Sequence, residues 1–67
     1  MNIGVIKARL DLIDHVKKDP EKAHIMEDDL YHDFIKFISG YPLSPEYIKD
    51  LAKEVLKSKK IEFGRWI

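Results

Sequence analysis

The sequence of 67 residues predicts an all-α fold: a compact three-helix bundle of residues 3–17, 20–39 and 45–57, followed by an ordered C-terminal tail or a short fourth helix. In each segment, apolar residues recur at the spacing of one helix face. Two breaks, Asp19-Pro20-Glu21 and Ser44-Pro45-Glu46, have the order of residue types that begins a helix. The chain has three Gly and three Pro and no internal repeat, so we expect one small helical domain without a linker.

The first predicted helix, residues 3–17, has an apolar arc with one charged residue inside it. At 100° per residue, the arc contains Val5, Ile6, Leu10, Leu12, Ile13 and Val16. Arg9 lies within this arc. Lys17 and Lys18 follow at its end, where the negative end of the helix dipole favours cations.

The second predicted helix, residues 20–39, begins where Asp19 can cap the exposed amides and Pro20 suits the first helical position. Its apolar arc contains Ala23, Met26, Leu30, Phe34, Phe37 and Ile38. Glu27 lies inside that arc. We expect the helix to stop at Gly40, which can adopt the left-handed conformation that ends many helices.

Arg9 and Glu27 lie at similar distances from the break at residues 18–19, one on each side of it. If the two helices fold back as an antiparallel hairpin, these side chains meet in a mostly apolar seam. We therefore predict a structural ion pair between them rather than a functional site. Removing one partner would cost about 3–5 kcal/mol if the other stays buried.

Ser44 and Pro45 begin the third predicted helix in the same manner. Its apolar side carries Tyr47, Ile48, Leu51, Ala52, Val55 and Leu56. In the tail, residues 59–67, the apolar residues fit both a strand and a helical turn, but a lone strand would have no partner. We expect a short helix or an ordered extension that packs Phe63 and Trp66 on the bundle.

Twelve basic and twelve acidic residues give no net charge, and the chain has no cysteine. Disulfides and thiolate metal sites are therefore excluded, which fits a cytoplasmic location. No apolar run approaches the roughly 18 residues that cross a bilayer, and the first residues lack the features of a secretory signal. We expect a soluble, unprocessed, cytoplasmic protein without a membrane partner.

Histidine and acidic side chains form a stripe on the second predicted helix: His24, Asp28 and His32, with Glu27 beside them. Side chains four residues apart converge, so a metal-dependent or nucleotide-handling site is one alternative function. No recognised metal spacing is completed, and a solvated helix edge with local ion pairs is the favoured interpretation. We expect no cofactor.

No catalytic arrangement is recognisable in the sequence. It has no Gly-rich phosphate loop, no Ser/His/Asp arrangement and no cysteine nucleophile, and so small a core has little room for a substrate pocket. We therefore do not expect an enzyme. Weak nucleic-acid binding through Lys57-Ser58-Lys59-Lys60 is a further alternative, but a solubilising flank is the favoured interpretation of this stretch.

Aromatic residues are numerous for so short a chain: Tyr31, Phe34, Phe37, Tyr41, Tyr47, Phe63 and Trp66. A monomer of this size can bury only part of this apolar surface, and the remainder suits a partner. The preferred function is therefore a small helical protein-interaction module, and a homodimer is one form that the interaction could take.

Four stretches carry a resemblance to known sequences: DPEKAH (19–24), EDDLYHDFI (27–35), AKEVLK (52–57) and IEFGRW (61–66). They resemble a family of short uncharacterised proteins encoded by bacteriophages and prophages. The resemblance implies an origin rather than an activity, and it carries over no catalytic residue; a phage-type modulator of a host protein is one form of the preferred interaction module. It directs attention to His24, Glu27, Asp28, Tyr31, Asp33, Arg65 and Trp66. Our interaction candidates are Tyr31, Phe63, Arg65 and Trp66, and Arg65 is an alternative to Arg9 as the partner of Glu27.

Overall fold

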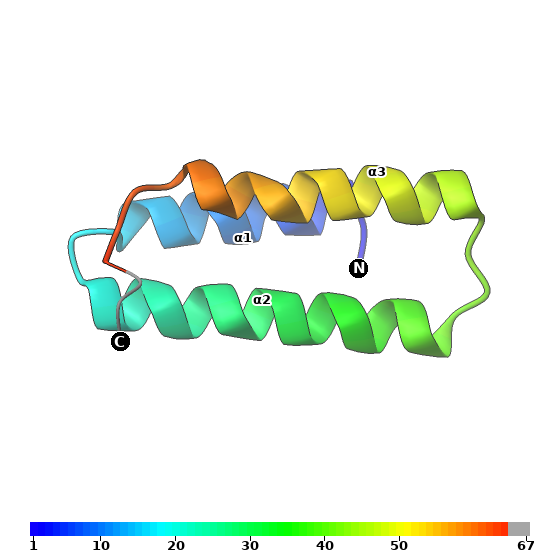
Figure 1. The fold of residues 1–67 in the computed structure, drawn as a ribbon, viewed down its shortest axis with the longest axis horizontal. Coiled ribbons are helices and arrows are strands. Elements are labelled where there is room, and N and C mark those ends of the chain that lie inside the picture. Colours follow the sequence, from blue (N-terminus) through cyan, green and yellow to red (C-terminus); the bar gives the residue numbers. More distant parts are fainter. Residues whose placement is uncertain (65–67) are drawn as a thin grey trace.

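The computed structural model describes residues 1–64 and confirms the all-α fold. Helices α1 (Ile3–His15), α2 (Pro20–Gly40) and α3 (Pro45–Leu56) are followed by a 3-10 turn, η1 (Lys57–Lys60), and the described part contains no β-strand. Figure 1 shows α2 running antiparallel to both α1 and α3. Each of the three helices packs against the other two, as expected of a three-helix bundle.

Side-chain caps determine where each helix begins. Asn2, Asp19 and Ser44 each accept a hydrogen bond from the backbone amide three residues later, at 2.9, 3.3 and 3.2 Å respectively. Pro20 and Pro45 follow two of these caps and occupy the first helical positions. Each cap satisfies an amide that has no partner within its own helix. The predicted caps at Asp19 and Ser44 are confirmed, and Asn2 adds a third that we had not predicted.

The helix ends differ from the sequence prediction. Helix α1 ends at His15, so Lys17 lies in the turn that leads to α2. Gly40 is still helical and does not have a positive φ, so the predicted left-handed glycine cap is wrong. Helix α2 is terminated at Tyr41, whose backbone is extended, with φ −127° and ψ 137°. A proline imposes this conformation on the residue before it, and Pro42 follows Tyr41 directly.

The core is built from eight buried apolar side chains of the three helices: Ile6, Leu10, Ile13, Ala23, Leu30, Phe34, Leu51 and Val55. These residues form narrower stripes than the predicted arcs. Val5 and Leu12 of α1, and Tyr47 and Leu56 of α3, are exposed although we expected them to face the core. A helix in a three-helix bundle buries only the side that faces its two neighbours, so the outer members of a wide apolar arc remain in contact with solvent.

The segment after α3 is an ordered extension. Ser58 in η1 is fully buried, and Ile61 and Phe63 pack against the core as partly buried side chains. The short fourth helix takes the form of η1, and the extension continues to residue 64. Trp66, which we expected to pack on the bundle with Phe63, lies outside the described residues.

Candidate interaction groove between α2 and α3

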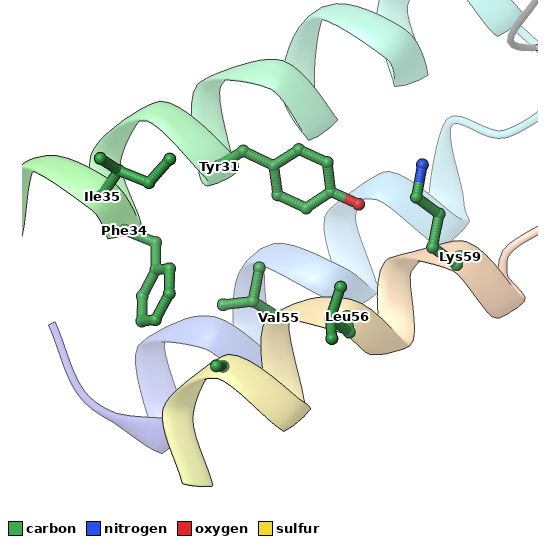
Figure 2. Close-up of a pocket in the computed structure, with 7 residues that line it drawn as sticks. Tyr31, Phe34, Ile35, Val55, Leu56 and Lys59 are labelled. Atoms are coloured by element: carbon green, nitrogen blue, oxygen red, sulfur yellow. The ribbon is translucent and has the colours of Figure 1, made fainter. Parts of the chain in front are cut away.

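An open groove of about 350 Å³ lies between α2 and α3. It is lined by Tyr31, Phe34, Ile35, Ala52, Val55, Leu56 and Lys59. Figure 2 shows side chains of α2 and of α3 projecting toward the space between the two helices, with α1 behind them. The lining side chains are apolar apart from the hydroxyl of Tyr31 and the ammonium group of Lys59. The shape and the apolar lining are typical of a binding site.

Two exposed aliphatic side chains flank this groove. Ile35 on α2 and Leu56 on α3 are 62% and 60% exposed, whereas Phe34 and Val55 between them are buried. A single exposed aliphatic residue is ordinary in a folded protein. Here two of them lie on facing helices beside one apolar depression, which is the kind of surface that a partner covers.

The ring of Tyr31 is held in place from the α3 side of the groove. Its hydroxyl forms a hydrogen bond with that of Ser58, which is fully buried. Nζ of Lys59 lies 5.8 Å from the centroid of the Tyr31 ring, within the range of a cation–π contact. One wall of the groove is therefore preformed. The role of Ser58 was not predicted, because a serine within a run of lysines gives no sign of burial.

The edge of the groove along α3 is basic. Lys49 and Lys53 are exposed and, at helical spacing, lie on the same side of α3 as Leu56. Lys59 lines the groove itself. Among residues 1–64, none of these three lysines forms an ion pair, whereas Lys57, the first residue of η1, is paired with Glu54. Beside the apolar lining this edge carries Lys53 and Lys59, whereas nearer the start of α3 Lys49 alternates with the exposed carboxylates of Glu46 and Asp50.

The stripe of His24, Asp28 and His32 is not assembled as a metal site. Nε2 of His24 lies 3.3 Å from the carboxylate of Asp28, but Nδ1 of His32 lies 3.7 Å from Asp33 instead. Glu27, the fourth candidate ligand, is 2% exposed and belongs to the core side of α2. In the described part of the chain, no group of three or more His, Cys, Asp or Glu residues is placed to hold a metal ion. The stripe consists of local contacts along a helix edge.

Among the described residues, Arg9 pairs with Asp33 and not with Glu27 as we had predicted. Its Nη1 donates a hydrogen bond of 2.8 Å to Oδ2 of Asp33, and the two side chains are 27% and 49% exposed. This hydrogen bond, together with the positive charges of Arg9 and His32, holds the pKa of Asp33 below its ordinary value. A partly hydrated pair avoids much of the desolvation cost that burial beside Glu27 would impose. Arg65 lies outside the described residues, so its pairing with Glu27 stays a prediction.

The four predicted interaction residues have different positions. Tyr31 lines the groove, and Phe63 is partly buried against the core. Arg65 and Trp66 lie outside the described residues, so their roles stay predictions. The structure adds Ile35, which we had not selected. The sequence did contain a signal for it, because Ile35 is an aliphatic residue outside the apolar arc of α2.

No known protein family, curated protein or solved structure matches the chain. Within residues 1–64, no helix is both long enough and apolar enough to cross a membrane. Function therefore has to be inferred from the groove and its surroundings.

Proposed function

We propose that this chain is a small protein-interaction module that binds its partner in the groove between α2 and α3. The observation that carries the proposal is the exposure of Ile35 and Leu56 on facing helices, beside the buried side chains of Phe34 and Val55. Covering exposed apolar surface contributes about 25 cal/mol per Å² to association. A partner that fills the groove would gain this contribution from both flanking residues.

The preformed wall of the groove supports the same role. Tyr31 is fixed by its hydrogen bond to Ser58 and by the contact of Lys59 with its ring. Phe34 and Val55 are held in the core. Few side chains of the groove would have to be ordered on binding, and preorganisation of this kind reduces the entropic cost of association.

The resemblance to short phage and prophage proteins fits this proposal. We expect no catalysis from this chain, so binding is the means by which we propose it modulates a host protein. We therefore propose a bacterial host protein as the partner. The alternative is self-association, and the experiment below distinguishes the two.

Two isoleucines of α2 provide a matched test. Ile35 flanks the groove and is 62% exposed, whereas Ile25 is 53% exposed and adjoins a different depression beside Asp19 and Met26. Immobilised wild-type protein should capture a partner from a bacterial lysate. Ile35→Asp should lose that partner and Ile25→Asp should retain it. Both variants should remain folded, because surface substitutions usually change stability by less than about 0.5 kcal/mol.

The oligomeric state separates the outcomes of this experiment. If the wild type shows concentration-dependent dimerisation in sedimentation equilibrium and Ile35→Asp does not, the partner is a second copy of the chain. Capture that is the same for both variants would contradict a role for the groove. Absence of capture, combined with a monomer at all concentrations, would contradict the proposed function.

A further inference from the structure

We infer that the occupant of the groove is an amphipathic helix with acidic residues along the edge that lies over α3. This inference rests on the proposed function and adds the chemical class of the partner. It depends on the length of the groove, on the arrangement of its walls and on the charge of one edge.

The length of the groove matches two turns of a helix. Along α3 and η1 the lining extends from Ala52 to Lys59, a distance of about 10 Å at 1.5 Å per residue. The walls are two antiparallel helices, and α1 lies behind them (Figures 1 and 2). A partner helix can place apolar residues at i, i+4 and i+7 between such walls over the same length. An extended peptide that binds by adding a strand would need a sheet edge, which residues 1–64 do not provide.

The charge of the α3 edge indicates which charge the flanking residues of the partner carry. Lys49, Lys53 and Lys59 are exposed, and none of them has a carboxylate partner among the described residues. The groove lining also contains no carboxylate. Acidic residues on one flank of the bound helix would therefore meet Lys53 and Lys59, with Lys49 about one turn beyond the lining, while its apolar face covers Ile35 and Leu56. Charge complementarity at the rim of an interface contributes mainly to specificity and to the rate of association.

Two other occupants fit these features less well. A twofold dimer brings the same patch of each copy together, and the lining of this groove carries Lys59 but no carboxylate to neutralise it. Nucleic acid could engage the lysines through its phosphates. It would, however, leave the apolar side chains of Ile35 and Leu56 without a matching surface.

The test uses three synthetic peptides of about 15 residues, a length at which isolated helices become stable. All carry leucine at i, i+4 and i+7, and they differ only in the residues on one flank, which are Glu, Gln or Lys. Each is titrated into the full-length, ¹⁵N-labelled protein. We expect the Glu peptide to shift the amide signals of Ile35, Ala52 and Leu56 and to bind about tenfold more tightly than the Gln peptide, with the Lys peptide weakest. The preference should shrink as salt is added.

Charge reversal on α3 provides the matched control. Lys49→Glu combined with Lys53→Glu should abolish the preference for the Glu peptide, whereas Lys7→Glu, an exposed site on α1, should leave it unchanged. Equal binding of the Glu and Gln peptides would overturn the inference and leave the proposed function standing. If no peptide binds, but a host protein is captured and the capture depends on Ile35, the inference is again overturned and the proposed function stands.

Two further results would assign the groove to another occupant and overturn the inference. One is a dimer that dissociates on replacement of Ile35 by Asp and excludes the peptides. The other is a short DNA duplex that binds more tightly than any peptide and loses affinity in the α3 double variant.

Discussion

Replacing Leu10 by alanine should destabilise the protein far more than the same replacement at Leu12, two residues later on α1. Leu10 is 9% exposed and belongs to the core with Ile6 and Ile13, whereas Leu12 is 55% exposed. The two variants have the same chemistry and lie on the same helix. Their difference therefore reports which side of α1 faces the core.

The expected magnitude follows from burial. Truncating a buried leucine costs about 2–5 kcal/mol, because the loss of apolar burial is accompanied by a cavity. Leu12 loses less than half as much buried surface, leaves no enclosed cavity and gains the higher helix propensity of alanine, so we expect a cost of at most about 1 kcal/mol. In a domain of this size each kcal/mol lowers the melting temperature by about 4–8 °C. Leu10→Ala should therefore melt at least about 8 °C below the wild type, and Leu12→Ala should melt within about 8 °C of it.

Thermal and urea denaturation followed by circular dichroism would measure both variants. The whole domain has a stability of only about 3–10 kcal/mol by its length. If Leu10→Ala is unfolded at room temperature while Leu12→Ala is folded, the result would therefore agree with the prediction. Equal losses, or a larger loss for Leu12→Ala, would refute the placement of α1 around its axis.

Three further substitutions test individual contacts. In Arg9→Met, the pKa of Asp33 measured by NMR should rise, because the hydrogen bond from Arg9 lowers it in the native protein. The pKa of Asp33 is lower in the native than in the unfolded state, so the stability from this pair is fully present above the unfolded-state pKa and is lost as pH falls through the native pKa. The free energy of unfolding of Arg9→Met should therefore fall less on acidification than that of the wild type. Tyr31→Phe removes the hydrogen bond to Ser58 and should lower the free energy of unfolding in urea by about 0.5–1.5 kcal/mol; an unchanged value would exclude a stabilising role for that bond. Ser44→Ala should cost about 1 kcal/mol and Ser44→Gly only a few tenths, and equal losses would argue against a capping role.

Helix starts could be predicted from the sequence because they depend on local chemistry. A capping side chain, a proline at the next position and an acid after it act within a single turn, as at Asp19 and Ser44. The end of α2 depended on a competition between two local signals. Gly40 could have ended the helix in a left-handed conformation, but the steric effect of Pro42 on Tyr41 ends it one residue later without one.

The partner of Arg9 could not be obtained from spacing alone. Counting residues from the turn suggests Glu27, whereas Asp33 lies six residues farther along α2, about 9 Å at 1.5 Å per residue. The axial offset of two packed helices depends on the path of the turn between them, which residue counts do not contain. The direction of each side chain matters as well. Glu27 shares the buried stripe of α2 with Leu30, while Asp33 is half exposed beside Arg9.

Leu56 shows why the groove could not be placed from periodicity. Its spacing assigns it to the same arc as Leu51 and Val55, but only those two are buried in the core. A leucine that remains 60% exposed contributes less to folding than the two buried residues do. Ile35, on the facing helix, lies outside the predicted apolar arc altogether. Both residues flank one apolar groove, and the proposed partner would cover the two together.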